Sequence, residues 1–189
     1  MNVYEIIMTR RTIRKFKQEP IGRGLLKKII DAARMAPTGS NRQPLSFAII
    51  TDKELCNKIF PLTKWAGYLQ GAYTPSESER PTAYIAVFTE LENKDSSETA
   101  AGAAVENMLI FAHSEGIGCC WMGAIDRERI PEILGSPKNK YLLYLVALGY
   151  PAESPVAAPY TDDVKYYLDE QNVLHVPKKS LDDVLIIDS

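Results

Sequence analysis

The chain has 189 residues and a mass of 21.1 kDa, the size of one ordinary globular domain. It carries 22 Lys and Arg against 24 Asp and Glu, a net charge of −2, which disfavours a general nucleic-acid binder because such proteins are usually basic. Three cysteines without CxxC spacing exclude a disulfide framework and fit a reducing compartment. No apolar run approaches the ~20 residues that span a membrane, and the start is too polar for a signal peptide, so we expect a cytoplasmic protein.

The first half of the chain alternates between helical and strand patterns. Residues 2–9 have one apolar helical face, and residues 24–35 repeat apolar side chains at helical spacing until Pro37 stops the pattern. The apolar run 45–51 predicts a buried strand, and residues 53–60 predict a short helix. Residues 64–81 are irregular, and we expect their aromatic side chains to shape a pocket: Trp65, Tyr68 and Tyr73.

The second half continues the same alternation. Residues 98–115 are apolar nearly all round and predict a central buried helix, with Ser97 as its N-terminal cap and Gly116 at its end. Strands are expected at 82–89, 119–125 and 141–148, and a short helix at 127–134. Residues 185–187 could add an edge strand or pair with another chain. We therefore expect a single α+β domain over residues 1–189, with one sheet and flanking helices.

A basic run follows the first helix and is the first candidate binding segment. Arg10, Arg11, Arg14 and Lys15 surround the hydroxyl of Thr12. Guanidinium groups offer paired donors to phosphate oxygens, and a neutral hydroxyl adds another donor. The alternative is a solvated charged turn, which composition alone favours.

The second candidate is the loop at residues 36–44. Gly39 stands among hydroxyl and amide side chains, so the loop offers many donors and a close backbone approach to a planar heteroaromatic ring. The alternative is an ordinary helix cap and turn, for which Pro, Gly, Ser and Asn are the usual residues.

The third candidate is the glycine-bounded run at residues 116–124, where glycines would let a ligand lie against backbone amides. Plain core packing is the alternative. No GxGxxG, GxxxxGK[ST] or GxSxG motif is present, so a Rossmann cofactor site and a P-loop are not expected.

The remaining polar residues suggest neither a metal site nor a nucleophile. His113 and His175 are far apart in sequence, and the adjacent Cys119 and Cys120 are expected to pack as small hydrophobes. Glu106 and Asn107, in the apolar helix, are interpreted as a structural polar pair, although a ligand or a subunit interface would also explain them.

Three segments, taken together and in this order, resemble the nitroreductase family. RRTIRKF at residues 10–16 resembles the family's RRSIRxF, and APTGSNRQP at 36–44 resembles APSxxNxQPW, with Leu45 where Trp is common. GIGCCWMGA at 116–124 is similar to GLGxxWxGxx, and VPKKSL at 176–181 resembles a basic tail motif. The resemblance covers essentially the whole chain.

The resemblance implies a nitroreductase-like fold, with a central, mostly antiparallel sheet flanked by helices, in a homodimer that holds FMN at its interface. It implies that NAD(P)H, either NADH or NADPH, reduces FMN, which then reduces a second substrate such as a nitroaromatic or a quinone. The residues matched to the FMN phosphate and ribityl chain are Arg10, Arg11, Thr12 and Arg14, completed by Lys178 or Lys179. Those matched to the loop that reaches the flavin from the partner subunit are Pro37, Thr38, Gly39, Ser40 and Asn41, with Gln43 in the same motif. Met122 and Gly123 match positions whose amides approach the flavin N5 and O4 edge.

No catalytic side chain and no metal ligand are assigned, because the flavin would carry the chemistry. Three alternatives stay open: a flavin-binding or storage protein without turnover, a structural domain without a cofactor, and another activity of the same scaffold, such as enone reduction, dehalogenation or flavin breakdown. The tail from about residue 151 is a candidate for wrapping the partner subunit.

Overall fold

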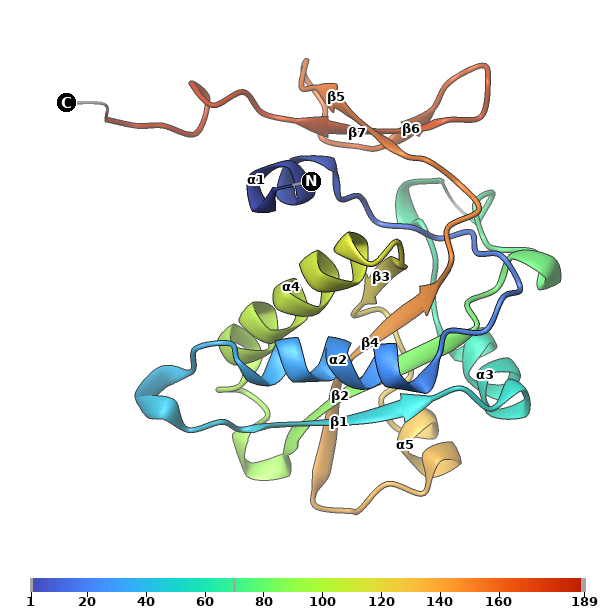
Figure 1. Cartoon of the computed structure of the whole chain (residues 1–189), viewed down its shortest axis with the longest axis vertical. Coiled ribbons are helices and arrows are strands. Elements are labelled where there is room, and N and C mark those ends of the chain that lie inside the picture. Colours follow the sequence, from blue (N-terminus) through green and yellow to red (C-terminus); the bar gives the residue numbers. More distant parts are fainter. Residues whose placement is uncertain (1, 70, 188–189) are drawn as a thin grey trace.

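A four-stranded antiparallel sheet, in the order β1-β2-β4-β3, forms the centre of the computed structural model in Figure 1. The structure describes residues 2–69 and 71–187. Met1, Gln70, Asp188 and Ser189 lie outside the described residues; Gln70 belongs to the irregular segment 64–81, which is called the insert below. The strands are β1 Leu45–Ile50, β2 Ala83–Glu90, β3 Gly118–Met122 and β4 Lys140–Gly149. The helices are α1 Val3–Thr9, α2 Arg23–Arg34, α3 Lys53–Ile59, α4 Glu98–Ser114 and α5 Arg129–Leu134. The expected α+β class with an antiparallel sheet is confirmed.

Helices cover both faces of this sheet, so its inner strands are apolar along their whole length. On β2, Ile85 and Val87 face the core beneath α2 and α4, whereas Tyr84 and Phe88 face a second core beneath α3 and α5. Alternate side chains of a strand point to opposite faces, so a continuous apolar run is what a doubly covered strand requires. α2 and α4 pack side by side across one face of the sheet (Figure 1).

The central helix α4 follows the expected path, with one difference at its start. Gly116 stops the helix with a φ of 75°, a left-handed conformation that glycine adopts without strain. Ser97 occupies the N-cap position, as predicted, but its side chain makes no capping hydrogen bond. Its hydroxyl instead bonds the carbonyl of Asn93, at 2.9 Å, and the Thr89 hydroxyl, at 2.8 Å, because the residue is itself nearly helical and faces the loop before it.

Glu106 and Asn107 of α4 do not form a pair with each other. The Asn107 amide donates to the carbonyl of Ala32 at 3.1 Å and joins α4 to α2, so for this residue the structural interpretation holds. The Glu106 carboxylate points the other way, toward Arg10. Within residues 2–69 and 71–187, no helix has the length and apolar character that crossing a membrane requires.

The C-terminal tail forms a second, separate sheet, so the expectation of one sheet is wrong. Its strands are β5 Val156–Pro159, β6 Tyr167–Leu168 and β7 Leu174–Lys178, in the order β5-β7-β6. Leu174 is buried against Ala66 and Tyr73 of the insert, so the small sheet is attached to the domain through the insert. These strands are too short and too polar for a sequence pattern to reveal them.

The edge strand considered for residues 185–187 does not form. Leu185 instead closes a turn on the carbonyl of Leu181, at 2.9 Å, and the chain then runs on without strand structure to residue 187. Ile186 and Ile187 are 94% and 76% exposed, so this end of the chain presents apolar side chains to its surroundings. In Figure 1 it extends away from the rest of the molecule.

Residues 10–15, the basic segment, run across the ends of β3 and β4 where two glycines face each other. Gly118 and Gly149 are paired in the sheet, and the buried side chains of Ile13 and Phe16 lie directly on them. A Cβ at Gly118 would come within 2.8 Å of Ile13, and one at Gly149 within 2.8 Å of Phe16. The absence of side chains at these two glycines therefore allows the segment to pass so close to the sheet.

We predict that Gly149→Ala destabilises the protein, because the added methyl group meets the rigid base of the Phe16 side chain. Overpacking of this kind costs about 1–3 kcal/mol, measured as a lower urea midpoint. Gly24→Ala is the matched control: it lies in α2 with nothing within 4 Å of its Cβ, and it should stabilise by about 0.5–1 kcal/mol. A Gly149→Ala variant as stable as the parent would contradict the close contact.

Candidate functional site

The basic segment is held rigidly by its backbone, which leaves its cationic side chains on the surface. The Ile13 amide donates to the carbonyl of Cys119 at 2.9 Å, so the segment extends the edge of the sheet beside β3. The Arg11 guanidinium donates to the carbonyls of Met8, at 2.7 Å, and Arg10, and thereby covers the end of α1. Its Nε is buried and meets no acceptor among the described residues.

The two outer arginines of the segment face different groups. Arg10 Nε lies 3.7 Å from a carboxylate oxygen of Glu106 on α4. The Arg14 guanidinium lies over the ring of Tyr166, with 4.9 Å between the guanidinium carbon and the ring centre. The structure therefore brings together the sequence-predicted Arg10, Arg11, Thr12 and Arg14 on one short stretch of surface.

A carboxylate that sequence reasoning missed, Glu153, holds the backbone of the basic segment. It accepts from the backbone N–H of Arg14 and, at 3.1 Å, from that of Lys15. Its second oxygen accepts from the Tyr73 hydroxyl of the insert. Burial and then this bond to Glu153 raise the pKa of Tyr73, so the phenol stays protonated as the donor. Sequence reasoning missed Glu153 because no motif surrounds it. Its contacts form only when the tail and the insert fold onto the basic segment.

Lys15 belongs to the same cluster and ties it to the insert. Its ammonium lies 3.3 Å from a carboxylate oxygen of Glu79 and 4.9 Å from the ring centre of Tyr73. The insert therefore contacts the basic segment through Tyr73 and Glu79, whereas Tyr68 is 53% exposed and packs on Tyr166 of the tail.

A cleft of about 350 Å³ opens beside the basic segment, between α4 and the start of the tail. Arg11, His113 and Glu153 line it, and the imidazole Nε2 of His113 lies 3.1 Å from the hydroxyl of Thr9. Burial lowers the pKa of His113, and the neighbouring Arg10 and Arg11 lower it further. The local potential is positive even though the whole chain is slightly acidic.

The second predicted element is the loop expected to contact the aromatic ring of a ligand, called the ring loop below. Its residues 37–43 have an unusual backbone. Ser40, Asn41 and Gln43 have φ angles of 52°, 52° and 47°, in the left-handed region that side chains other than glycine rarely adopt. The backbone N–H of Gln43 donates to the Thr38 hydroxyl at 3.1 Å and closes the loop on itself. Such strain persists only where the surroundings enforce it, and it is concentrated at functional sites.

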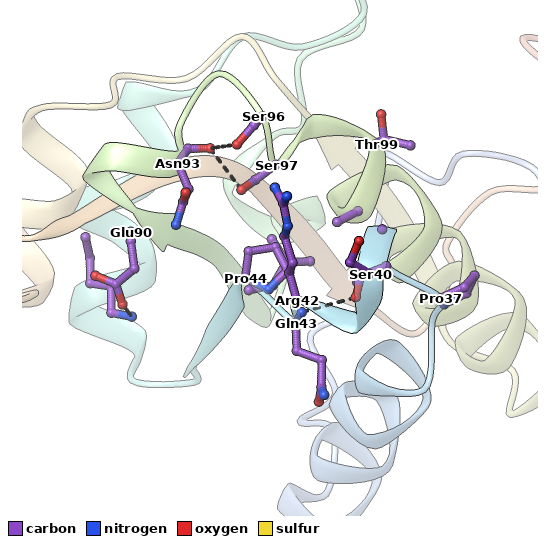
Figure 2. Close-up of a pocket in the computed structure, with 15 residues that line it drawn as sticks. Pro37, Ser40, Arg42, Gln43, Pro44, Glu90, Asn93, Ser96, Ser97 and Thr99 are labelled. Carbon is purple, nitrogen blue, oxygen red and sulfur yellow. Dashed lines mark hydrogen bonds and ion pairs between the residues drawn. The ribbon is translucent and has the colours of Figure 1, made fainter.

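Figure 2 shows the cleft beside the ring loop, whose volume is about 610 Å³. Arg42 extends toward Ser97 across this cleft, whereas the side chain of Gln43 points away from it. The opposite wall is polar, with an ion pair between Glu90 and Lys140. Pro37, Thr38, Gly39 and Ser40 line the loop side of the cleft.

The basic segment and the ring loop lie at opposite ends of α4. Thr99 at the start of the helix lines the ring-loop cleft, and His113 at its end lines the cleft beside the basic segment. The step of 14 residues from Thr99 to His113 spans about 21 Å at a rise of 1.5 Å per residue. The two clefts therefore open near different ends of the helix, and Arg10 of the basic segment reaches Glu106 between them.

Met122 and Gly123 stand at the far end of β3 from the basic segment. Met122 is buried, and Gly123 is exposed in a hollow of about 480 Å³ that Lys64 and Arg127 also line. Trp121 before them packs edge-on against Tyr144 with 5.2 Å between ring centres. The contact of these backbone amides with a ligand stays a prediction.

The two predicted lysines are at the end of the tail sheet. Lys178 is the last residue of β7, and the ammonium of Lys179 lies 5.8 Å from the ring centre of Tyr160. Within the described chain, no hydrogen bond or ion pair joins either lysine to the basic segment. Their assignment to a phosphate stays a prediction.

The cysteines beside the basic segment are buried thiols. Burial raises the pKa of Cys120 to about 11, and burial raises that of Cys119 as well, so neither is a thiolate at neutral pH. This agrees with the expectation that they pack as small hydrophobes. Among residues 2–69 and 71–187, no group of three or more His, Cys, Asp or Glu side chains is placed to hold a metal ion.

Comparison with known proteins identifies the family. The model of the nitroreductase family matches residues 7–150, which include the basic segment, the ring loop and β3. The chain belongs to the nitroreductase family. The resemblance drawn from the sequence motifs is thereby confirmed.

Three proteins similar to this nitroreductase-family chain differ in how much of their own length it covers. A protein of Archaeoglobus fulgidus, provisionally named NADH dehydrogenase/NAD(P)H nitroreductase, is 31% identical over 79% of this chain and 85% of its own. The NADPH-flavin oxidoreductase of Vibrio harveyi is 29% identical over 84% of this chain and 69% of its own. A solved structure from Desulfovibrio desulfuricans, determined in complex with FMN, has a TM-score of 0.72 at 25% identity and covers 100% of this chain and 98% of its own.

We predict that His113 titrates below the usual histidine pKa of about 6.5, because the folded protein disfavours its charged form. A group whose pKa is lowered on folding contributes stability above about pH 6.5 that is lost as the pH falls through the folded value. An NMR titration of the ring protons, assigned with His113→Gln, measures the pKa. Urea midpoints should fall less on acidification in His113→Gln than in the parent. A pKa at or above that of the unfolded chain would contradict the prediction.

Proposed function

We propose that this protein is an FMN-dependent oxidoreductase that uses NADH or NADPH to reduce small electrophilic acceptors such as nitroaromatics or quinones. The observation that carries the proposal is the position of the family's three motifs in the fold: a rigid cationic segment, a strained donor-rich loop and an exposed strand end. The names of the Vibrio harveyi relative and the FMN complex from Desulfovibrio desulfuricans support the choice of cofactor.

The basic segment fits the phosphate of FMN. Four cationic side chains lie within six residues, and Arg11 has a buried Nε that meets no acceptor among the described residues. Arg10, Arg11, Thr12 and Arg14 would bind the phosphate and the ribityl chain, with Lys178 or Lys179 as further donors. Glu153 would support this from behind, since it fixes the backbone of Arg14 and Lys15 without occupying their side chains.

The ring loop fits an aromatic edge rich in carbonyl and nitrogen acceptors. Its exposed hydroxyl and amide groups, on Thr38, Ser40 and Asn41, are held in one geometry by the strained backbone. Because the loop and the basic segment lie at opposite ends of α4, we propose that the loop reaches the flavin of a second copy. Pro37, Gly39 and Gln43 belong to the same contact.

When bound, FMN supplies the hydride chemistry by accepting electrons from NAD(P)H and passing them to the acceptor. The residues of the chain itself would bind FMN and orient it. The backbone N–H groups around Met122 and Gly123 would stabilise negative charge on the reduced ring without a titrating side chain. The raised thiol pKa values of Cys119 and Cys120 agree with a mechanism that needs no nucleophile from the protein.

Exposed apolar side chains support a homodimer. On α1, Val3 and Ile7 are exposed although they continue the apolar face that Ile6 buries. The end of the tail, with Ile186 and Ile187, is exposed as well and would cover the partner subunit. A monomer rarely shows so many apolar side chains in neighbouring elements, whereas an obligate dimer buries them.

Reduction by a nicotinamide cofactor tests the enzymatic proposal against a protein that only stores flavin. Under anaerobic conditions, NADH or NADPH should bleach the absorbance of bound oxidised FMN, and a quinone or a nitroaromatic should restore it. Free FMN with the same reagents is the control. A protein that binds FMN tightly and is not bleached by either nucleotide would favour storage.

We predict that Arg14→Ala weakens FMN binding roughly tenfold to a hundredfold, because a charged contact to phosphate contributes about 1.5–3 kcal/mol. Arg42→Ala, at a variable position of the ring loop, should weaken it far less. A fluorescence titration measures both affinities, and thermal unfolding of the apo proteins shows whether loss of the Tyr166 contact matters instead. Equal losses of affinity would place the phosphate elsewhere.

Mixing of two defective variants tests the shared site. Arg14→Ala damages the phosphate segment, and Ser40→Pro damages the ring loop because proline cannot adopt a φ of 52°. In a mixed dimer, one site carries both changes and the other carries none, so random mixing should restore roughly a quarter of the parental activity. No recovery after refolding the two variants together would show that each site is built from one chain.

A further inference from the structure

A cleft of about 720 Å³ lies away from all the residues discussed above, between α3 and the last residues of the insert. It is on the side of the sheet covered by α3 and α5, with Cys56 and Asn57 of α3 on one wall. Arg80 and Thr82 are on the other wall, and Gln18 is at the rim. None of the family's motif residues line it, so the proposed flavin site does not account for it.

The Arg80 guanidinium is fixed in this cleft by an aromatic ring. Its central carbon lies 4.3 Å from the ring centre of Phe60, which is itself stacked on Trp65 with 5.7 Å between ring centres. Gln18 donates to the Arg80 carbonyl at 2.9 Å, which also fixes the backbone. A guanidinium held on an aromatic face is already ordered before a ligand binds, so binding costs little further side-chain entropy.

One donor of this guanidinium is not satisfied by the described residues. Arg80 Nε is buried and meets no acceptor in residues 2–69 and 71–187, and no ion pair of those residues involves Arg80. A buried cationic donor without a partner is costly and rare in folded proteins. Lys15, Arg10 and Lys140 all have carboxylate partners, whereas Arg80 shares a buried, unpartnered Nε with Arg11 of the basic segment.

A second unsatisfied donor lies close by. The side chain of Tyr84 on β2 is fully buried, and its hydroxyl meets no partner among the described residues. Burial raises the pKa of this phenol, Cys56 and Cys120 raise it further, and Arg80 opposes them, so the hydroxyl is a neutral donor near both Cys56 and Arg80. Tyr84 is enclosed in the core and does not line the cleft, so Arg80 is the donor that the cleft itself presents.

The charges around the cleft select the ligand. Lys53 and Arg80 are cations and Glu77 is an anion, so the lining carries one net positive charge. Pro20 and Pro81 add apolar wall. A guanidinium matches a carboxylate with two parallel hydrogen bonds. We propose that this cleft binds a small organic carboxylate, whose oxygens accept from the guanidinium of Arg80.

The two tryptophans make a direct test possible. Trp65 lies beneath Arg80 through Phe60, whereas Trp121 lies beside Met122 at the other site. We expect propionate, added to the full FMN-loaded protein, to shift the indole N–H signal of Trp65 in a ¹H–¹⁵N spectrum and to leave that of Trp121 in place. Trp121→Phe assigns the two signals, and sodium chloride controls for ionic strength.

Variants separate the proposed site from general anion binding. Arg80→Met should weaken propionate binding at least about tenfold, since hydrogen bonds to a charged group are the stronger ones. Arg23→Met, at the exposed start of α2, is the matched control and should bind like the parent. Inorganic phosphate should bind more weakly than propionate.

Four results would overturn the proposal. They are no shift of Trp65, equal binding by Arg80→Met and Arg23→Met, a preference for phosphate, and release of FMN by propionate. Because the signal of Trp65 and the affinities are read without turnover, the result is independent of whether the protein reduces any acceptor.

Discussion

The contact of Ile13 and Phe16 with the facing glycines Gly118 and Gly149 determines how the rest of the molecule is arranged. A chain segment can cross the end of a sheet at this distance only where no side chain stands in its way. Once the two apolar side chains are fixed there, the residues between and around them must face outward. Thr12 and the arginines are thus presented by an anchored backbone, and the chain that follows Gly149 must pass over the same segment.

That passage explains the polar cluster at Glu153. The tail leaves the sheet at Pro151, beside Phe16, and places a carboxylate under two consecutive amides of the basic segment. A negative charge at this position fixes the backbone and also balances part of the cationic surface. The proposed division of one flavin site between two copies follows from the length of α4, because a helix that long separates the cationic segment of a chain from its own strained loop.

Most of the main sheet could be read from the sequence because its strands and helices are buried on regular faces. The runs at β2 and β4 are continuous and apolar, and α2 has a clear helical stripe, so local pattern and final structure agree. The tail sheet could not be read, since it is stabilised by contacts with the insert rather than by its own composition. Glu153, Arg80 and Tyr84 were missed for a related reason: their importance lies in which partners they have, or lack, across long distances in sequence. The motif residues were identified from their order in the sequence, whereas their positions relative to α4 became clear only in the fold.

The insert and the tail are joined by the small core of Ala66, Tyr73 and Leu174, by the packing of Tyr68 on Tyr166 and by the bond from Tyr73 to Glu153. Segments whose contacts are few and lie outside the central core unfold together and at lower free energy than the central sheet. Insert and tail therefore form a single cooperative unit, in which amide hydrogens exchange with solvent at a common rate while those of β2 and β4 stay protected. Changes in the length or sequence of the insert would accordingly affect the tail first, although its Leu174 is about 100 residues from Tyr73 in the chain.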